Sequence, residues 1–301
     1  MRPTLLFLAA LVAAGAVVAW FVTAPNPLPA AEVEGLEGDA ERGAALFTQA
    51  GCASCHVASG VSEGDGAPVL AGGMAFETRY GTFHAPNISP SSQGIGDWSD
   101  TDLVNAIARG ISPSGSHYYP ALPYTSYENA ELQDLVDIVA HLRTLPESDA
   151  ASLPHDLSFP FNIRRTLGGW KMLYANRGWV MDEPASAEVE RGRYLVEALF
   201  HCGQCHTPRT ALGGMDRDRW LQGAPNPDGQ GRIPGITPGQ IGWSDADLAA
   251  YLKTGLTPDF DSAGGQMAAV VRHLNTLPGE DIAAIVAYLR AVPAAEETGT
   301  E

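Results

Sequence analysis

The sequence predicts a mostly α-helical protein in which two tandem units of one design follow an N-terminal apolar segment. Three observations lead to this prediction. A five-residue word, Cys-x-x-Cys-His, occurs at residues 52–56 and again at 202–206. The same ordered series of shorter words follows each copy, and the residues from Leu5 to Val22 carry no charge. The length of 301 residues fits two domains of ordinary size.

The spacing within the five-residue word is typical of the attachment site of a c-type haem. Two thiols on one short helical turn reach the two vinyl groups of a porphyrin, and the adjacent histidine lies under the iron. All four cysteines of the chain belong to the two words, so no second cysteine pair remains to complete a zinc site. No βαβ pattern suggests a redox dithiol. The sequence therefore predicts two covalently bound haem c groups, each with a proximal histidine. The residues expected to hold them are Cys52, Cys55 and His56, and Cys202, Cys205 and His206.

The apolar segment is expected to be a membrane anchor or a signal peptide within residues 1–24. Its length of about 18 apolar residues is at the lower limit for crossing a bilayer. Trp20 and Phe21 resemble an interfacial aromatic pair, which favours an uncleaved anchor with Arg2 on the cytoplasmic side. A signal peptide would instead be removed after export. Because covalent haem attachment takes place outside the cytoplasmic membrane, the bulk of the chain is expected in the bacterial periplasm. Residues 25–38, rich in proline, are predicted to form a stiff spacer.

The first unit is expected to span residues 39–150. Asp39 is a plausible N-cap for a helix that leads into the first haem word. A glycine-rich loop that contains Pro68 follows this word. Ser99 is predicted to cap a helix that runs to Arg109 and ends at Gly110. Apolar residues at helical spacing predict a last helix near 132–142, before Pro146.

The second unit is expected to span residues 185–293 and repeats this order. The words at 235–238 and 243–245 match those at 87–90 and 98–100, and a last helix near 281–291 matches the one before Pro146. Residues 151–184 form a connector that belongs to neither unit and that combines aromatic and basic side chains. Such a segment suits either packing between the units or contact with a partner subunit or membrane. The acidic tail, 294–301, is predicted to be disordered.

The charge balance excludes one class of partner. The chain has a formal net charge of −17, which argues against nucleic-acid binding. It favours partners that present basic patches, and it also keeps a periplasmic protein soluble.

The repeat can be used to predict the ligand on the far side of each iron. Met267 lies 24 residues after Trp243, whereas the residue 24 positions after Trp98 is Leu122. Met267 is therefore the predicted ligand of the second haem, and leucine cannot bind iron. Three alternatives remain open for the first haem. His117 could bind the iron from the same loop as Leu122, His84 or Met74 could bind it from another loop, or the iron could stay five-coordinate.

The words 85–90, 94–100 and 119–124 resemble those of the cytochrome c subunits of membrane-bound bacterial dehydrogenases that act on alcohols, gluconate or aldehydes. The resemblance covers nearly all of 39–293 and implies two tandem cytochrome c class I domains. Members commonly carry three haem domains, and methionine commonly stands where Leu122 does. By the same resemblance, Met267 matches the ligand position, and Pro68 supplies the carbonyl that accepts the proton of the His56 ring.

The function implied is electron transfer in the periplasm. A dehydrogenase subunit is expected as the donor, and a quinone, another cytochrome or an oxidase as the acceptor. In this hypothesis the haems carry out the redox chemistry and no side chain acts as an acid or base. Unequal iron ligands predict unequal potentials, with the lower one at the first haem. The alternative is an enzyme of the di-haem peroxidase kind, which would use an open first haem to bind a small molecule.

Overall fold

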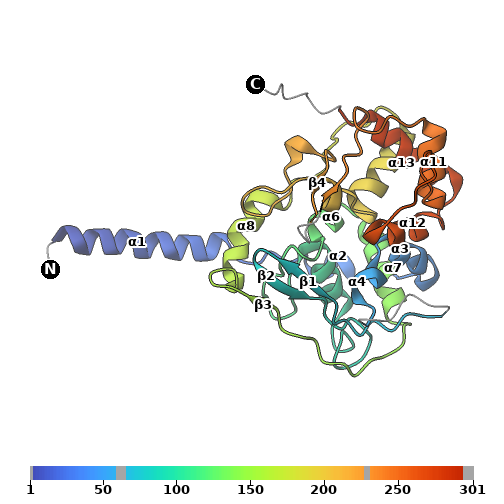
Figure 1. Cartoon of the computed structure of the whole chain (residues 1–301). Coiled ribbons are helices and arrows are strands. Elements are labelled where there is room, and N and C mark those ends of the chain that lie inside the picture. The colour runs from blue at the N-terminus through green and yellow to red at the C-terminus, as the bar shows by residue number, and fades with distance from the viewer. Residues whose placement is uncertain (1–2, 59–65, 227–230, 294–301) are drawn as a thin grey trace, which may run out of the picture.

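The protein is a helical body from which one long helix projects. The computed structural model describes residues 3–58, 66–226 and 231–293. Helix α1 (Pro3–Val22) points away from the body and buries none of its side chains (Figure 1). Its 20 residues give a helix of about 30 Å, so α1 is long and apolar enough to cross a membrane. The predicted acidic tail, 294–301, lies outside the described residues.

The prediction that residues 25–38 form an extended spacer is wrong. This segment folds back onto the body through helix α2 (Ala30–Val33), and the side chain of Val33 is buried. The side chain of Asn105 accepts from the Leu28 backbone N–H at 2.7 Å and donates to the Leu28 carbonyl at 3.3 Å. Proline restricts the backbone but does not prevent packing, and here an amide side chain satisfies the backbone groups that the prolines leave without partners.

The first half is built on two crossed helices, α3 (Ala40–Gln49) and α7 (Leu132–Leu142). As predicted, Asp39 caps α3 and accepts from two backbone N–H groups. The helices touch at Gly43, where an added Cβ would lie 1.9 Å from the Asp137 carbonyl oxygen. Between them in sequence come helices α4 (Cys52–His56), α5 (Asp100–Val104) and α6 (Tyr124–Tyr127), and the π-helix η1 (Asn105–Arg109). Ser99 caps α5 in a capping box, and Gly110 ends η1 in a left-handed conformation.

The second half repeats these contacts with different residues. Helix α9 (Ala187–Arg193) continues into the π-helix η3 (Tyr194–Leu199) and crosses α13 (Gly279–Ala291). At this crossing a Cβ on Gly192 would lie 2.0 Å from the Ala284 carbonyl oxygen, as at Gly43. Ser244 caps α11 (Asp245–Thr254) with the capping box seen at Ser99. The remaining elements of this half are α10 (Gly203–His206), η4 (Arg217–Arg219), α12 (Gly265–Leu274) and the short strands β4 (Ala224–Pro225) and β5 (Arg232–Ile233).

One arginine in each half binds the Trp-Ser-Asp word, at residues 98–100 and at 243–245. Arg143 donates to the Trp98 carbonyl at 2.5 Å and to Asp100 at 2.9 Å. Arg290 donates to the Trp243 carbonyl at 2.5 Å and to Asp245 at 2.7 Å. The same guanidinium geometry therefore joins the last helix to the capped helix in both halves, which supports the predicted duplication.

A small sheet was not predicted. Strands β1 (Ala75–Thr78) and β2 (Gly81–His84) form an antiparallel hairpin in the first half. Strand β3 (Asp156–Leu157), from the connector, pairs with β2. The connector then forms the 3-10 helix η2 (Arg164–Thr166) and helix α8 (Leu167–Tyr174), which lies beside the inner end of α1 (Figure 1). The connector is thus packed against both α1 and the first half.

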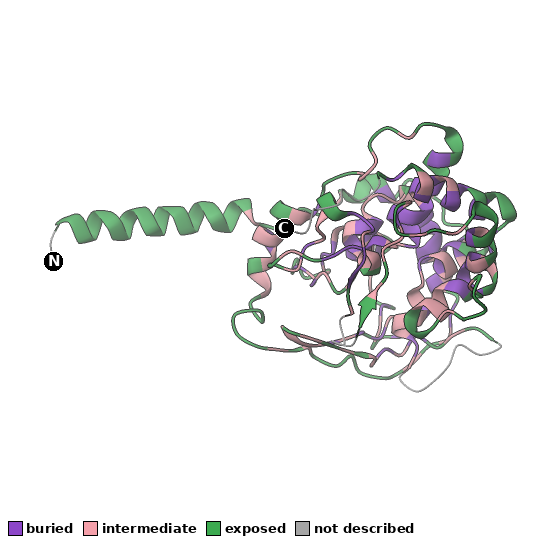
Figure 2. Cartoon of the chain, turned by 45° about the horizontal axis from the view of Figure 1, so that its top comes forward, coloured by how far each residue is buried: buried purple, intermediate pink, exposed green. Residues whose placement is uncertain are grey.

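The buried residues concentrate along the crossed helices of each half (Figure 2). The largest fully buried side chains include Leu135 and Val139 on α7, Leu195 and Leu199 on η3, and Tyr288 on α13. These helices carry the core against which the two haem words are placed.

Candidate functional site

The first haem word forms its own short helix, α4, directly after a left-handed residue. Gly51 has φ +67° and turns the chain so that Cys52 begins α4 and His56 ends it. Neither Cys52 nor Cys55 forms a disulfide. Burial raises the pKa of Cys52 to about 12, which keeps it a thiol and not a thiolate. Two thiols and an imidazole therefore lie on one helical turn.

The proximal ring of His56 is fixed by a backbone carbonyl. Its Nδ1 lies 2.8 Å from the carbonyl oxygen of Pro86. A carbonyl only accepts, so Nδ1 carries the proton and Nε2 keeps a lone pair for a metal. Burial lowers the pKa of His56 below its ordinary value, which also favours the neutral ring. The prediction that Pro68 is this acceptor is wrong, because the carbonyl within hydrogen-bonding distance of the ring belongs to Pro86.

The second word has the same arrangement. Cys202 precedes α10, Cys205 lies within it and His206 ends it. The Nδ1 of His206 donates to the Pro234 carbonyl oxygen at 2.8 Å, the distance found at Pro86. The residue ahead of this word, His201, is also left-handed, with φ +41°. Each half thus presents two thiols and a neutral imidazole with the same tautomer.

The carbonyl that accepts from His56 could have been predicted from the sequence. Pro86 and Pro234 each stand two residues before an isoleucine, in the words 86–90 and 234–238 that define the repeat. Pro68 has no counterpart at the matching place in the second half. A proline whose carbonyl accepts from the proximal histidine in each half should belong to the repeated words. Of Pro68 and Pro86, only Pro86 does.

The loop opposite the histidine in each half has the same backbone. The backbone bridge between Ile111 and His117 corresponds to that between Leu256 and Ser262. In both loops a backbone N–H closes onto the glycine that ends the preceding helix, from Tyr118 to Gly110 and from Ala263 to Gly255, at 2.7 Å. Matching residues of the two loops are 145 positions apart in the sequence, and the same offset relates Leu122 to Met267. The match ends before the ligand position, because Met267 lies within α12 (Gly265–Leu274), whereas Leu122 lies in a turn before α6 (Tyr124–Tyr127), so the ligand stays a prediction.

His117 lies in the loop that carries Leu122, but not at the position that matches Met267. His117 occupies the place of Ser262 at the base of the loop, five positions before the ligand position. Its side chain is buried, and its Nε2 donates to the Thr23 carbonyl oxygen at 3.0 Å. Nε2 therefore holds the inner end of α1, while the buried Nδ1 has no hydrogen-bond partner within the described residues, and His117 as a ligand stays a prediction.

The structure gives backbone contacts for the two further candidates for the first haem, and the Nδ1 atom of the His84 ring has no hydrogen-bond partner within the described residues. His84 lies at the end of β2, where its backbone N–H donates to the Nδ1 of His155 at 3.1 Å. Met74 lies just before β1, and its carbonyl accepts from the Ala85 N–H at 2.9 Å. Neither contact involves the loop that carries Leu122.

The two haem words lie at the contact between the halves. The Ala50 carbonyl, just before the first word, accepts from the Tyr127 hydroxyl at 2.7 Å and from the Nε2 of His201 at 3.3 Å. The rings of Tyr127 and His201 meet edge to face, with centroids 5.6 Å apart. Burial raises the pKa of Cys55 to about 11, with a smaller contribution from Cys205 of the second word. The attachment points thus approach across the interface.

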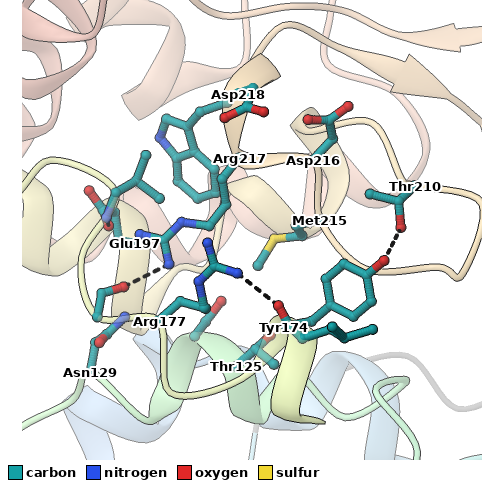
Figure 3. Close-up of a pocket in the computed structure, with 15 residues that line it drawn as sticks. Thr125, Asn129, Tyr174, Arg177, Glu197, Thr210, Met215, Asp216, Arg217 and Asp218 are labelled. Carbon is teal, nitrogen blue, oxygen red and sulfur yellow. Dashed lines mark hydrogen bonds between the residues drawn. The ribbon is translucent and has the colours of Figure 1, made fainter. Parts of the chain in front are cut away.

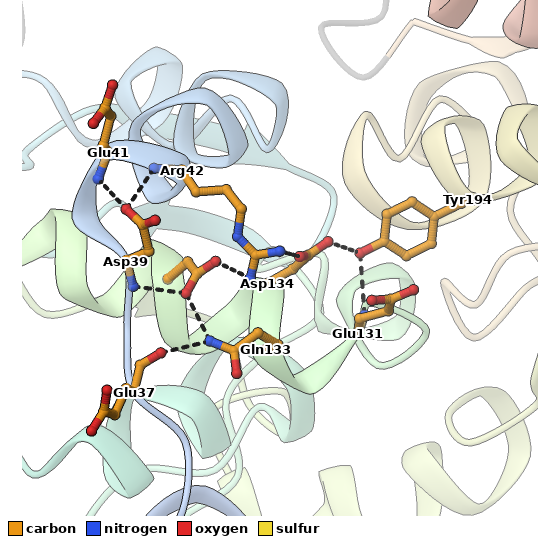
Figure 4. Close-up of polar contacts among 9 residues, drawn as sticks. Glu37, Asp39, Glu41, Arg42, Glu131, Gln133, Asp134 and Tyr194 are labelled. Atoms are coloured by element: carbon orange, nitrogen blue, oxygen red, sulfur yellow. Dashed lines mark hydrogen bonds and ion pairs between the residues drawn. The ribbon is translucent and has the colours of Figure 1, made fainter.

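A second contact between the halves involves charged groups. The Arg42 guanidinium lies between the carboxylates of Asp134 and Asp137 on α7 (Figure 4). Tyr194, from the second half, donates its hydroxyl to Asp134 and accepts from the Glu131 N–H at 3.2 Å. This network joins η3 to α7 and so helps to fix the two words relative to each other.

A pocket of about 190 Å³ lies where the connector meets both halves, since Thr125, Ser126 and Asn129 of the first half also line it (Figure 3). The side chains of Arg177 and Arg217 point into it, and Arg217 donates to the Gly178 carbonyl at 3.0 Å. Glu197 borders the pocket and accepts from the Tyr288 hydroxyl at 2.6 Å, and burial raises its pKa. Neither haem word lines this pocket, and its polar groups join the connector to the second half.

The chemistry of the two donor sets fits covalently attached haem. Thiols can add across vinyl groups to form thioethers, and a neutral imidazole with a free Nε2 can bind iron. The repeat provides one such set in each half. Within the described residues, no cluster of three or more histidine, cysteine or acidic side chains could hold a metal ion without a porphyrin.

Comparison with known proteins agrees with this chemistry. Residues 40–146 match the family model for cytochrome c. The chain is 53% identical over 290 residues to a diheme cytochrome c-type protein of Cereibacter sphaeroides, covering 96% of this chain and 97% of that protein. It is 40% identical over 266 residues to the fructose dehydrogenase cytochrome subunit of Gluconobacter japonicus, covering 86% of this chain and 53% of that subunit. It is 34% identical over 276 residues to the gluconate 2-dehydrogenase cytochrome c subunit of Pantoea cypripedii, covering 86% and 61%.

The fold, the donor sets and these relatives define a c-type cytochrome. The chain belongs to the cytochrome c family, with two covalently bound haem c groups and relatives among the cytochrome subunits of dehydrogenases. It spans nearly the whole of the diheme relative but only about half of the fructose dehydrogenase subunit.

Proposed function

We propose that this protein is a membrane-anchored di-haem cytochrome that carries electrons in the periplasm from a dehydrogenase partner to the respiratory chain. The acceptor in this proposal is a quinone, another cytochrome or an oxidase. The observation that carries it is the pair of matched proximal histidines, whose Nδ1 atoms donate to Pro86 and Pro234 at 2.8 Å. The dehydrogenase subunits among its relatives support the choice of donor.

The residues proposed to hold the haems follow from the donor sets. Cys52 and Cys55 form the thioethers of the first haem, and His56 binds its iron. Cys202, Cys205 and His206 do the same for the second haem, whose far ligand is Met267 on α12. The bound haem supplies one-electron redox chemistry, and the protein sets its potential through the ligands, hydrogen bonds and burial.

The domain assignment belongs to the same proposal. Residues 39–150 and 185–293 are two tandem cytochrome c class I domains, and 151–184 is the connector. Residues 1–24 anchor the chain on the periplasmic side of the inner membrane. The crossings at Gly43 and Gly192 support two domains, and the exposed apolar surface of α1 supports the anchor.

A second candidate function rests on one residue. Leu122 stands where the second half has Met267, and its side chain has no atom that binds iron. A first haem without a far ligand could bind a small molecule, as in di-haem peroxidases.

One set of measurements separates the two functions. The full chain, purified from membranes in detergent, is reduced and mixed with an oxidised basic cytochrome c as a probe acceptor, and separately with hydrogen peroxide. A carrier is expected to reduce the probe rapidly and to consume peroxide no faster than an added haem peptide does. Catalytic peroxide turnover with slow transfer to the probe would overturn the carrier proposal. A protein mass without two added haems would contradict both functions.

A further inference from the structure

The inner end of α1 is fixed to the body by three contacts. The Thr23 carbonyl accepts from His117, and an added Cβ on Gly168 would lie only 2.1 Å from the same oxygen. The Arg165 guanidinium stacks 4.3 Å from the centroid of the Trp20 ring and donates to the Trp20 carbonyl. The direction in which α1 leaves the body is therefore set by packing and hydrogen bonds.

Large apolar side chains are exposed around this junction. Phe159 is 79% exposed, and Phe161 and Ile163 are 44% and 42% exposed, on the loop that leads into η2. Met172 on α8 is 58% exposed. It lies four residues after Gly168, so it shares the helix face that contacts α1. Residues 159–173, which we call the collar, thus present apolar groups beside the exit of α1 (Figures 1 and 2).

The charge of the collar differs from that of the remaining chain. From residue 157 to 181 there is no acidic residue. Arg164, Arg165 and Lys171 supply three positive charges within the collar, and Arg177 supplies a fourth just after it. The whole chain carries −17, so the other residues together carry −21. A segment that is basic and apolar within an acidic protein fits an anionic lipid surface, where cations lie among phosphates and apolar groups enter the interface.

The cations of the collar do not need acidic partners within the protein. Arg164 donates to the His117 carbonyl at 3.2 Å, and Lys171 donates to the Arg109 carbonyl at 2.5 Å. Bonds to neutral carbonyls orient these side chains without neutralising their charge. Lys171 also interacts with the Glu128 carboxylate, so Arg164 and Arg165 supply most of the positive potential of the collar.

We propose that the collar rests on the anionic headgroup region of the bilayer that α1 crosses, with Phe159, Phe161, Ile163 and Met172 in the interfacial zone. This inference rests on the proposed membrane anchor. It follows because α1 is fixed at its inner end, so the surface around its exit faces the bilayer. Two phenylalanines, an isoleucine and a methionine at this depth gain from leaving water.

The collar also orients the first half. The Tyr119 hydroxyl donates to the Phe161 carbonyl at 2.9 Å, and the Arg164 guanidinium lies 4.8 Å from the centroid of the Tyr119 ring. Tyr119 belongs to the loop that carries Leu122. Contact of the collar with lipid therefore places this loop toward the membrane.

The test uses the full chain in nanodiscs of zwitterionic and anionic phospholipid. A fraction of the lipid carries a photoactivatable diazirine in the acyl chain close to the headgroup. After illumination, mass spectrometry is expected to find lipid adducts on α1 and on peptides from 159–173. Replacing the anionic lipid by zwitterionic lipid should lower the collar adducts about five-fold and leave those on α1 unchanged.

A triple variant and a matched control sharpen the test. Phe159→Ser with Phe161→Ser and Ile163→Ser should lower the adducts on α8 about five-fold without changing those on α1. Phe260→Ser, which alters a phenylalanine that is 96% exposed but lies outside the collar, should change neither. Adducts confined to α1 in the unaltered chain would overturn the collar proposal and leave the anchor standing. A lack of adducts on α1 would overturn the anchor and, with it, the collar.

Discussion

The two halves of this molecule share a backbone framework and differ at a few matched positions. The helix crossings at Gly43 and Gly192 and the arginine contacts at Trp98 and Trp243 are alike. The first half has Leu122 where the second has Met267. Left-handed turns that use glycine at Gly51 and Gly115 in the first half use His201 and Phe260 in the second. The duplicated framework thus tolerates single substitutions that change a ligand or a local strain.

The two left-handed residues of the second half differ in what their side chains do. His201 reaches the Ala50 carbonyl and packs on Tyr127, so its side chain contributes to the contact between the halves. Phe260 has φ +65° and is 96% exposed. A left-handed conformation costs about 1–2 kcal/mol for a residue with a Cβ, and only His201 offsets this cost with contacts to the other half.

The largest expected effect comes from removing the thiols of one half. Cys202→Ala with Cys205→Ala should remove one of the two haems, since the thiols of the other word lie on a separate helix. Protein mass and haem content measure the loss, and redox titration should then show one midpoint. Cys52→Ala with Cys55→Ala is the matched variant and should leave the other midpoint. Retention of both haems in either variant would contradict the assignment.

The helix crossings predict the next largest effect. Gly43→Ala places a methyl group against the Asp137 carbonyl, whose oxygen would lie 1.9 Å from the new Cβ. The helices must separate, and we expect the free energy of unfolding of the first half to fall by about 3 kcal/mol. Thermal unfolding followed at the two haem bands measures this change. Gly15→Ala, on the exposed face of α1 with open space around it, serves as the control and should have no effect on the body.

Exchanging the residues at the ligand position tests the difference between the haems. Leu122→Met should raise the midpoint potential of the first haem and bring it closer to that of the second, because methionine ligation raises the potential. Met267→Leu should lower the potential of the second haem. Redox titration of the full chain gives both values. If Met267→Leu left both midpoints unchanged, Met267 would not be the ligand.

One pH dependence of the first half is expected from His155. Burial, with the nearby charges of Arg164 and His84, lowers the pKa of His155 from 6.5 to about 4. Its ring packs between Phe83 and Tyr119 and accepts from the His84 N–H, which requires the neutral form. The unfolded chain takes up a proton below pH 6.5. The stability from this site is therefore complete above pH 6.5 and is lost as the pH falls toward 4.

His155→Gln keeps an acceptor but does not titrate, so the first unfolding transition should depend less on pH between 6.5 and 4. Thermal unfolding at a series of pH values measures this slope. The transition of the second half should have the same slope in both proteins. An unchanged slope for the first transition would show that His155 is not the group responsible.

The smallest expected effect is the relief of local strain in the second half. Phe260→Gly gives this turn the residue type found at Gly115, where φ is +73°. We expect the second half to become more stable by about 1 kcal/mol. The reverse change, Gly115→Ala, should make the first half less stable by a similar amount. Denaturant unfolding of both variants provides the measurement, and a stability loss in Phe260→Gly would reveal a contact made by the ring.

The sequence was sufficient to predict elements that depend on local chemistry. The caps at Asp39 and Ser99 and the end of a helix at Gly110 are confirmed, because caps and left-handed turns are set by a few neighbouring residues. The order of helices in both halves followed from the repeated words. The small sheet was missed because β3 comes from the connector and pairs with a hairpin about 70 residues earlier.

Site residues that depend on contacts between distant segments were harder to predict. The acceptor for His56 comes from a loop that passes beneath the ring, so its distance in sequence did not reveal whether Pro68 or Pro86 would supply it. His117 was assigned to iron because a ligand was missing nearby. The partner of its Nε2, Thr23, lies 94 positions away at the end of α1. A buried histidine takes the acceptor that the fold brings to it, which local spacing does not show.

The packing of Thr23 bears on how the newly made chain is processed. Gly168 has no side chain at the point where residue 23 is seated, and the imidazole of His117 is directed to the same carbonyl. If a leader peptidase removed residues 1–24, the mature protein would have an empty space beside Gly168. The buried imidazole of His117 would also lose its hydrogen-bond acceptor. The proposed uncleaved anchor therefore predicts that N-terminal sequencing of the exported protein begins ahead of position 23.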